Sequence, residues 1–379
     1  MAVIIGIERA TVDLTRDTKS FGPENEQIDA SDYIGKRLLN PSVTIAIPVL
    51  NEEKYIEKVV CNFLNNTYAN IIEILVADGG SLDGTRNIVS DLAKKDGRVK
   101  LLNNEKMVQS SALNLMIKEA KGEIFIRADA HCEYDLHYVE RSVEVLLTTK
   151  AHNVGGAQRF VAENLVQAGV AIAVRSYLGS GGAKYRNPDY SGYADTVFLG
   201  SYYSDELRQI YGFREENRTN EDAELNLRLL EKFDKAIYVD SKICSWYYPR
   251  RSLISLWKQY FWYGWGRHLT LRNHTRSTPI RGRIPFWAIS ILLIYIFTDL
   301  FFPWKLYTAW IATAILCLYF IESIRVNIIM VPAFMSDIWR GDTGEYPSFF
   351  TRIILVFLVF IIMQTAHFVG YVYQFFKKN

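Results

Sequence analysis

Short apolar runs alternate with segments of helical spacing in the first third of the chain. The runs predicted to be strands are Val43–Ile47, Ile71–Ala77, Val99–Asn103 and Glu123–Asp129. Helical spacing follows the first three, in NEEKYIEKVVCNFL, near Arg86–Ala93 and in SALNLMIKEA. Strand followed by helix, repeated, predicts a parallel sheet with helices on both faces. Ligands of such sheets bind beyond the carboxyl ends of the strands, so the residues after each strand are site candidates.

The last hundred residues have a different pattern, because long stretches carry almost no charge. Stretches 284–302, 304–321 and 353–376 contain Asp299, Lys305 and no charged residue, respectively. At about 1.5 Å per residue, these lengths approach the thickness of a bilayer's hydrocarbon core. Three membrane spans are predicted, with buried helices of a large soluble core as the alternative. The run Val326–Met335 is too short to span and contains Pro332, which predicts a separate interfacial or re-entrant segment.

Charge also separates two parts of the chain. Residues 1–240 hold 28 basic and 36 acidic residues, a net of −8, whereas residues 241–379 hold 15 and 5, a net of +10. The total of +2 argues against a dedicated nucleic-acid binder. Residues 241–298 combine nine Lys or Arg and no acid with many Trp and Tyr, which is typical of helices at an anionic membrane face. The positive-inside rule then places the preceding domain on the cytoplasmic side of the cell membrane.

These patterns predict four parts of the chain. They are an N-terminal extension (1–40), a cytosolic domain (41–240), basic aromatic amphipathic helices at the membrane interface (241–283) and a multi-pass transmembrane region (284–379). The extension carries scattered charges and no motif, so it does not resemble a secretory leader. The four cysteines are far apart and form no CxxC pair, which predicts neither a disulfide framework nor a structural zinc site.

Polar residues crowd the positions after the predicted strands. They are Asn51 and Glu52 after the first strand, Asp78, Ser81 and Asp83 after the second, and Asp129 and His131 after the fourth. Turn formation and helix capping would explain Asn51, Ser81 or Asp83 singly, but not the whole set. The segment DGGSLDG lacks the lysine of GxxxxGK[ST] and the spacing of GxGxxG, so both nucleotide-binding fingerprints are excluded.

Four motifs follow one another along the chain in this order: IPVLNEE, VADGGSLDGT, QSSALNLMIKEAKGEIFIRADAH and NEDAELNLRL. In this order the sequence resembles the family 2 glycosyltransferases with the GT-A fold, and in particular the membrane-anchored succinoglycan-type glucosyltransferases. The resemblance covers roughly residues 41–275. It implies an α/β, Rossmann-like nucleotide-sugar-binding domain followed by an α-helical transmembrane region.

The resemblance also implies a donor site. The nucleotide sugar would contact Pro48, Val49, Asn51, Glu52, Asp78, Ser81, Asp83, Gln109, Asn114, Arg127 and Asp129. Asp78 would accept a hydrogen bond from the uracil edge, which suits an ionised carboxylate. The family's DxD motif is Asp129-Ala130-His131 here, so Asp129 and His131 would hold Mn²⁺ or Mg²⁺ against the donor diphosphate. A surface histidine that starts the next helix is the alternative for His131.

The same resemblance makes Asp222 the general base, since an acceptor hydroxyl must lose its proton as it attacks the anomeric carbon. Attack opposite the departing diphosphate implies inversion. Carboxylates are also favoured at a helix N-terminus, which alone would explain either Glu221 or Asp222. The acceptor or the diphosphate would contact Lys184, Arg186, Glu221, Arg250, Gln259 and Arg267, with plain solvation as the alternative for Lys184 and Arg186.

The expected activity is transfer of a hexose from UDP-glucose or a related UDP-hexose to a polyprenyl-diphosphate-linked glycan at the lipid bilayer. Two departures from the family matter: no lysine or arginine occupies Val108–Ser110 before the ALN triplet, and the QxxRW motif of processive synthases is absent at Gln259. One alternative is a polyprenyl-phosphate hexose synthase, whose phosphate acceptor needs no deprotonation by Asp222. A catalytically inactive scaffold that binds nucleotide sugar or lipid is the other.

Overall fold

The computed structural model describes residues 40–216, 219–273, 283–299, 301 and 305–377 of the 379-residue chain. Residues 1–39 of the predicted N-terminal extension lie outside the described residues. Contacts divide the chain into Met1–Asn40 and Pro41–Asn379. They join the second part into one unit across the boundaries predicted at residues 240 and 283.

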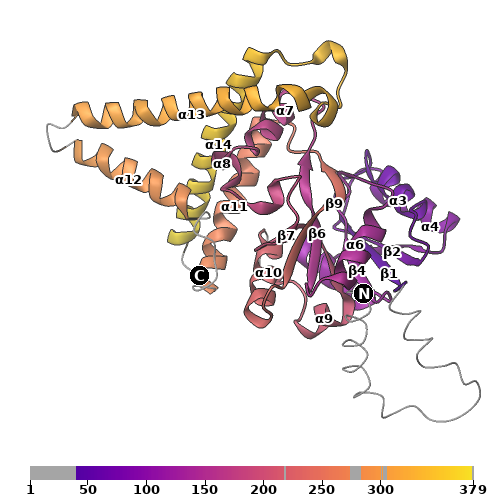
Figure 1. Cartoon of the computed structure of the whole chain (residues 1–379). Helices are drawn as coiled ribbons and strands as arrows, with labels where there is room; N and C mark the ends of the chain where they lie inside the picture. Colours follow the sequence, from indigo (N-terminus) through magenta and orange to yellow (C-terminus); the bar gives the residue numbers. More distant parts are fainter. Residues whose placement is uncertain (1–39, 217–218, 274–282, 300, 302–304, 378–379) are drawn as a thin grey trace, which may run out of the picture. The chain divides into compact units, whose positions relative to one another are not determined.

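In the described residues, one mixed sheet forms the centre of this unit (Figure 1). Its strands are β1 (Val43–Val49), β2 (Ile71–Asp78), β3 (Val99–Asn103), β4 (Ile124–Arg127), β5 (Cys132–Tyr134), β6 (Asn153–Phe160), β7 (Gly192–Tyr193), β8 (Phe198–Tyr203) and β9 (Ile237–Tyr247). Their order is β3-β2-β1-β4-β8-β6-β9-β5, and β7 also pairs with β9. The predicted parallel sheet is correct for β3-β2-β1-β4.

The other half of the sheet is mixed, so the prediction of a parallel sheet does not hold throughout it. Strand β8 runs antiparallel to both β4 and β6, and β5 runs antiparallel to β9, whereas β6 and β9 are parallel. An antiparallel neighbour needs no crossover helix, so the strand–helix alternation that predicts a parallel pair is lost here. Strand β8 follows a long loop and enters the sheet beside β4, which places the second half of the chain next to the strand that carries Arg127.

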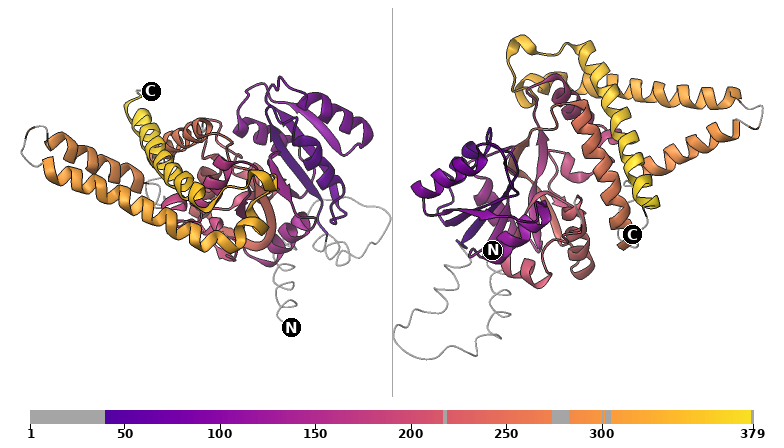
Figure 2. Two further views of the ribbon diagram at one scale, coloured as in Figure 1. Left: turned by 90° about the horizontal axis from the view of Figure 1, so that it is seen from above. Right: turned by 180° about the vertical axis from the view of Figure 1, so that it is seen from behind.

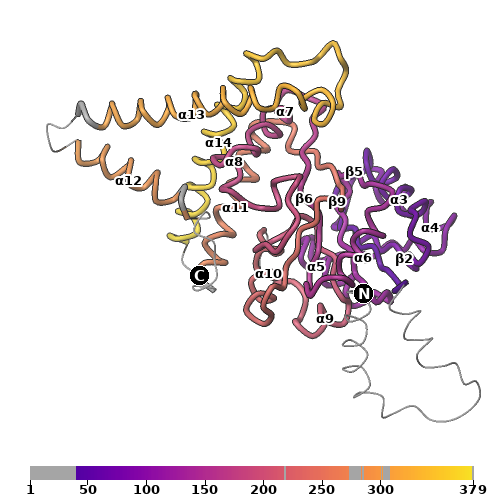
Figure 3. Tube along the Cα trace, viewed as in Figure 1, coloured from indigo at the N-terminus to yellow at the C-terminus, as the bar shows by residue number. Residues whose placement is uncertain are grey.

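Helices cover both faces of the sheet. Those of the sheet region are α3 (Ile56–Leu64), α4 (Thr85–Lys95), α5 (Gln109–Glu119), α6 (Tyr138–Thr148), α7 (Leu165–Ala173), α8 (Tyr177–Ser180), η1 (Lys184–Arg186), α9 (Ser204–Gln209) and α10 (Glu221–Lys232). Ile45 and Ile47 of β1 join a core with α3, α4 and α6, whereas Ala46 joins a second core with α5, α9 and α10. Figure 3 labels helices of both groups along the chain trace. Burial of both faces explains why these strands are continuous apolar runs rather than alternating ones.

The C-terminal region is helical in its described residues. It comprises α11 (Leu253–Asn273), α12 (Ile284–Asp299), α13 (Lys305–Ala333), η3 (Phe334–Ile338), η4 (Thr343–Glu345) and α14 (Phe349–Phe376). Two helical stretches, Thr308–Ile338 and Phe349–Phe376, are long and apolar enough to cross a membrane by length and composition, whereas Phe286–Asp299 is shorter. Core helices of soluble proteins can meet the same criteria.

The boundaries of the second predicted span need a correction. Helix α13 does not end at Ile321 but continues through Glu322 and Arg325 to Ala333, so Val326–Met335 is not a separate re-entrant segment. Glu322 and Arg325 pair with each other one turn apart, at 2.6 Å, which lets the helix continue through two charges. Pro332 is the last but one residue of α13 and removes one backbone hydrogen bond, and the helical stretch continues directly after Ala333 as the π-helical turn η3.

The predicted interface helices also need a correction. Residues 241–247 complete β9, which pairs with β6, and the helix α11 begins only at Leu253; residues 274–282 lie outside the described residues. Helix α11 packs closely against α14 (Figure 2). A Cβ atom at Gly264 would overlap the carbonyl of His367, and one at Gly370 would overlap the carbonyl of Phe261. These glycines therefore let the two helix backbones touch.

Candidate active site

The loops after β1 and β2 are tied together by side-chain hydrogen bonds to backbone. The N–H of Asn51 donates to Ser81 Oγ at 2.8 Å, and the N–H of Leu82 donates to Asn51 Oδ1 at 2.8 Å. Asn51 has a φ of 56°, a left-handed conformation that asparagine tolerates. Pro48 and Val49 extend β1 beside β2, which fixes where this loop starts. Asn51 and Ser81 thus build the frame of the predicted donor site.

Asp83 has a similar structural role within these loops. Its Oδ1 accepts hydrogen bonds from the N–H and the hydroxyl of Thr85, at 3.0 and 2.6 Å, and its Oδ2 accepts one from the N–H of Glu53 at 3.1 Å. Burial acts to raise the pKa of Asp83, but the hydrogen bonds from Thr85 outweigh it and the pKa is lowered. The carboxylate is therefore ionised and engaged with its own loop.

Asp78, at the end of β2, is fully buried. Its carboxylate accepts hydrogen bonds from the N–H groups of Gly80 and Ser81, at 3.1 and 3.2 Å, and from Arg86 Nη1 at 2.7 Å. Burial acts to raise the pKa of Asp78, whereas the hydrogen bonds from Ser81 and Arg86 prevail and lower it. A uracil edge would share an acceptor that already orders the turn.

Arg127 gathers carboxylates from two separate elements. It ends β4, is only 3% exposed, and reaches Asp129 Oδ1 at 3.3 Å, Glu221 Oε1 at 3.4 Å and, at shorter range, Asp222 Oδ1. Asn220, with a φ of 61°, turns the chain into α10, so that both Glu221 and Asp222 stand in its first turn. A buried guanidinium needs such partners, because an unpaired buried charge is very costly.

The two carboxylates of α10 differ in exposure. The side chain of Glu221 is 7% exposed and that of Asp222 is 37% exposed, so Asp222 is the one a substrate can reach. Burial raises the pKa of both groups; the negative charge of Asp129 adds to this at each, and Arg127 opposes it. A raised pKa brings Asp222 closer to the range in which a general base works at neutral pH.

His131 is held by another predicted donor-site residue. Its Nδ1 lies 3.0 Å from Glu52 Oε1, and its ring lies 5.4 Å from that of Tyr247. A proton on Nδ1 satisfies this contact and leaves Nε2 as the nitrogen that can bind a metal ion. The described residues hold no group of three His, Cys, Asp or Glu that could bind a metal ion by themselves. Asp129 and His131 therefore fit an ion whose other ligands are diphosphate oxygens, rather than an all-protein site.

The predicted donor residues Asn114 and Gln109 lie on α5 in different surroundings. The side chain of Asn114 donates to the carbonyl of Phe213 and accepts from its N–H, each at 2.8 Å, so both ends of its amide hold the 213 region. Gln109 begins α5 at the edge of an open cleft of about 490 Å³. The cleft is lined by Lys106, Met107, Val108, Gln109, Thr219 and Trp262.

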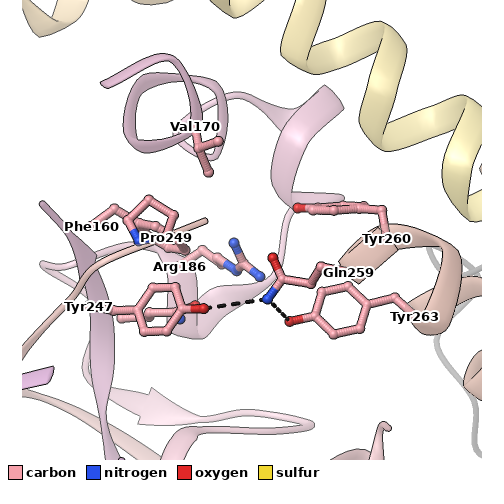
Figure 4. A pocket seen from close by; sticks show the side chains of 9 residues that line it. Phe160, Val170, Arg186, Tyr247, Pro249, Gln259, Tyr260 and Tyr263 are labelled. Atoms are coloured by element: carbon pink, nitrogen blue, oxygen red, sulfur yellow. Dashed lines mark hydrogen bonds between the residues drawn. The ribbon is translucent and has the colours of Figure 1, made fainter. Parts of the chain in front are cut away.

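Two of the predicted acceptor residues meet in a small cavity (Figure 4). It is lined by Gln158, Phe160, Val170, Arg186, Tyr247, Pro249, Gln259, Tyr260 and Tyr263. The guanidinium of Arg186 lies 5.0 Å from the ring centre of Phe160, and Gln259 Nε2 donates to the hydroxyl of Tyr263 at 3.0 Å. In the described part of the chain no carboxylate lies within ion-pair distance of Arg186, whose guanidinium instead contacts the rings of Phe160 and Tyr185 beside a cavity of about 20 Å³.

The other predicted acceptor cations lie elsewhere. Lys184 is exposed and donates to the carbonyl of Tyr193 at 3.0 Å. Arg250 is exposed beside Pro249 at the end of the strand that lines the cavity, and Arg267 lies on α11. The structure thus brings Arg186 and Gln259 together and places Glu221 in the Arg127 cluster.

Sequence reasoning missed two residues of this region. Arg86 is the ion-pair partner of Asp78. The sequence signal for this pair is a cation in the first turn of helix α4. The helix dipole disfavours a positive charge there, so a carboxylate partner is expected. Trp262 lines the open cleft, but in the run QYFWYGWG it is one aromatic among several. Which of these aromatic residues faces the cleft is decided by the rotation of helix α11 about its own axis.

Comparison with known proteins identifies the family. Residues 44–206 match Glycosyl transferase family 2. The chain is 36% identical over 250 residues to the "Succinoglycan biosynthesis protein ExoA" of Rhizobium meliloti, covering 65% of this chain and 76% of that protein. The chain belongs to glycosyltransferase family 2. This confirms the resemblance that the four motifs indicate.

A second relative of this family 2 glycosyltransferase is an archaeal protein. It is the "Dolichyl N-acetyl-alpha-D-glucosaminyl phosphate 3-beta-D-2,3-diacetamido-2,3-dideoxy-beta-D-glucuronosyltransferase" of Methanococcus voltae, 32% identical over 267 residues, which cover 68% of this chain and 82% of that protein. The solved structure of "Mannosyltransferase PcManGT from Pyrobaculum calidifontis" shares the fold, with a TM-score of 0.52, 17% identity and coverage of 92% and 94%. The family 2 domain therefore has a GT-A-like α/β fold with a mixed sheet.

Proposed function

We propose that this family 2 glycosyltransferase is a membrane-bound, inverting enzyme that transfers a hexose from UDP-glucose or a related UDP-hexose to a polyprenyl-diphosphate-linked glycan. The observation that carries the proposal is the Arg127 cluster. One buried guanidinium joins Asp129, at the strand end where the donor diphosphate is expected, to Asp222, the predicted base. The departing diphosphate of the donor and the attacking hydroxyl of the acceptor would therefore lie on opposite sides of the Arg127 side chain.

In the proposed step, Asp222 accepts the proton of the acceptor hydroxyl as that oxygen forms a bond with the anomeric carbon. The bond from the anomeric carbon to the diphosphate oxygen breaks on the opposite face, and the nucleoside diphosphate leaves with the electron pair. Configuration at the anomeric carbon is inverted. The exposure of Asp222 and its raised pKa both support this role.

Asp129 and His131 would hold Mn²⁺ or Mg²⁺, and the imidazole suits Mn²⁺ better. Such an ion, when bound, offsets the negative charge on the departing diphosphate. Glu52 supports the assignment, because its contact with His131 Nδ1 orients the ring as carboxylates do behind many metal-binding histidines. The loops at Pro48–Glu53 and Asp78–Asp83 would hold the nucleoside.

Membrane association is supported by the helices of the C-terminal region. Large apolar side chains are exposed along α12 and α13, including Trp287, Ile294, Phe297, Trp310, Leu318 and Ile329. Contiguous apolar exposure of this kind indicates a lipid or protein environment. We propose that α12, α13 and α14 are embedded in the cell membrane and that the sheet domain faces the cytoplasm. The names of the two relatives, one of polysaccharide biosynthesis and one with a dolichyl-linked acceptor, support a lipid-linked glycan acceptor.

A polyprenyl-phosphate hexose synthase is the second candidate, and one observation favours it. Arg186 presents a guanidinium in a cavity beside Gln259, with no carboxylate at ion-pair distance among the described residues. A lipid phosphate would satisfy that charge, since arginine binds phosphate through charge-assisted hydrogen bonds. A diphosphate that carries a glycan would satisfy it as well, so dependence on Asp222 separates the two candidates.

The test is release of UDP from a panel of nucleotide sugars by the full chain in detergent, with Mn²⁺ or Mg²⁺ and an extract of polyprenyl-linked glycans. Asp222→Asn is expected to lower transfer by about 10²- to 10⁴-fold while donor affinity changes little, because only the proton acceptor is lost. The matched control is Glu231→Gln, at the other end of α10. Equal release by wild type and Asp222→Asn would favour transfer to lipid phosphate, and no release with any donor would favour the scaffold.

The same assay tests the metal. Excess EDTA is expected to abolish transfer, and added Mn²⁺ is expected to restore it. Full activity in EDTA would contradict the role given to Asp129 and His131.

A further inference from the structure

The open cleft beside α5 is lined in part by the segment that leads into the proposed base, Asp222. Its walls come from the 106–109 segment, from Trp262 of α11 and from Thr219, three residues before Asp222. The hydroxyl of Thr219 donates to the carbonyl of Trp262 at 2.8 Å, so the α11 wall is attached to the segment that leads into α10. A ligand in this cleft would therefore lie against the start of the helix that carries Asp222.

The chemistry of the cleft suits an uncharged polar ligand. Among the lining residues that the structure describes, Lys106 is the charged one, and its Nζ is paired with Glu215 Oε2 at 2.5 Å. The other polar lining groups are an amide, of Gln109, and a hydroxyl, of Thr219. Trp262 adds a broad aromatic surface that is 38% exposed. An aromatic wall with a few amide and hydroxyl groups matches a sugar ring, whose faces are apolar and whose edges carry hydroxyls.

The Arg186 cavity on the same helix has the opposite chemistry. Gln259 and Tyr263 line that cavity together with Arg186 (Figure 4), whereas Trp262 lines the open cleft. Within one turn, α11 thus presents one side to an anion and another to a neutral polar group. An acceptor made of a phosphate and a sugar offers both.

We infer that Trp262 is the surface on which the terminal sugar of the acceptor lies, and that the acceptor is therefore a glycan rather than a bare lipid phosphate. The inference rests on the proposed function and deepens it by assigning the acceptor's sugar to the α11 wall of the cleft. Gln109, on the α5 wall, belongs to the donor side. Transfer then occurs across the cleft, beside Asp222.

The experiment compares substitutions of two tryptophans that are equally exposed on one helix. Trp262 and Trp257 both lie on α11 and are both 38% exposed, but only Trp262 lines the cleft in the described structure. The full chain in detergent is assayed with UDP-hexose and a polyprenyl-diphosphate-linked saccharide. Trp262→Ala is expected to raise the acceptor KM about tenfold with the donor KM unchanged, whereas Trp262→Phe stays within about threefold of wild type. Trp257→Ala is expected to leave both constants unchanged.

Three results would overturn the inference: an unchanged acceptor KM in Trp262→Ala, a rise confined to the donor KM, or equal wild-type rates on the saccharide and on bare polyprenyl phosphate. Trp262→Phe keeps an aromatic ring and guards against loss of folding, as does a comparison of thermal unfolding midpoints. Asp222→Asn in the same assay distinguishes failure of the proposed function from failure of the inference about Trp262. If it matches wild type the proposed function fails, and if it is inactive while Trp262→Ala is normal only the inference fails.

Discussion

The loops after β1 and β2 and the cluster around Arg127 both contain carboxylates, but they satisfy them in different ways. In the loops, Asp78 and Asp83 accept most of their hydrogen bonds from groups in their own loop and the start of α4, and Asp83 accepts one from Glu53 in the neighbouring loop. In the cluster, Arg127 binds carboxylates from residues 129, 221 and 222, nearly a hundred positions apart. The first arrangement is local and the second depends on the whole sheet.

This difference indicates which part of the site is held by its own loops and which part depends on distant segments of the chain. The donor loops would keep their geometry if α10 or α11 moved, since their hydrogen bonds join residues 51–53 to residues 81–83. The acceptor side would lose its geometry if either helix moved. Thr219 and Asn220 bind the carbonyls of Trp262 and Tyr263 on α11, and α11 in turn packs against α14. A proposed membrane helix therefore supports the base through one intermediate helix.

The largest effect should come from the residue where the two sides meet. Arg127→Gln would leave three carboxylates close together without their cation, so we expect the free energy of unfolding to fall by about 3–5 kcal/mol and transfer to be lost. Chemical denaturation followed by circular dichroism measures the first effect. Arg98→Gln breaks the more exposed pair with Asp96 and should cost less than about 1 kcal/mol. Equal losses in the two variants would mean that Arg127 is not the link between the donor and acceptor sides.

The contrast also explains what the sequence could predict. Strands β1 to β4 lie within two residues of their predicted ends, because apolar runs and the polar turns after them are local signals. The order of motifs likewise led to the correct family. The metal pair Asp129 and His131 and the base Asp222 stay predictions, for which the structure supplies a consistent arrangement.

The rest depended on contacts between distant segments. The antiparallel strand β8, which brings α10 to Arg127, follows a loop without helical spacing and left no periodic signal. The sequence could not show which of the two carboxylates at the start of α10 a substrate can reach. Glu221 and Asp222 differ in their burial, and burial depends on the folded surroundings. In the C-terminal region, Pro332 suggested a break, but the helical stretch passes through it and continues to Ile338 as the π-helical turn η3.

A medium effect is expected where α11 meets the segment before the base. A Cβ atom at Gly266 would lie 2.5 Å from Thr219 Oγ1 and 2.8 Å from Asn220 Nδ2, so Gly266→Ala must displace the residues that lead into Asp222. We expect kcat to fall about tenfold with the donor KM nearly unchanged, because positioning of the base and not donor binding is disturbed. Gly97→Ala, whose added Cβ would meet nothing within 4 Å, is the control. A rise in donor KM instead would show that the two sides are not independent.

The smallest effect should come from the donor loops themselves. Ser81→Ala removes the acceptor for the N–H of Asn51 and the hydroxyl that bonds Asp78, but it leaves the bond between Asn51 Oδ1 and the N–H of Leu82, so the loops stay joined. Loss of these partly exposed hydrogen bonds costs about 1 kcal/mol, which predicts a rise of about fivefold in donor KM with kcat nearly constant. Ser90→Ala makes the same change on α4, away from the loops, and should be silent. Initial rates over a range of UDP-hexose concentrations measure both constants. A fall in kcat equal to that of Gly266→Ala would mean that these loops also position the base, and the division between a local donor side and a remotely supported acceptor side would fail.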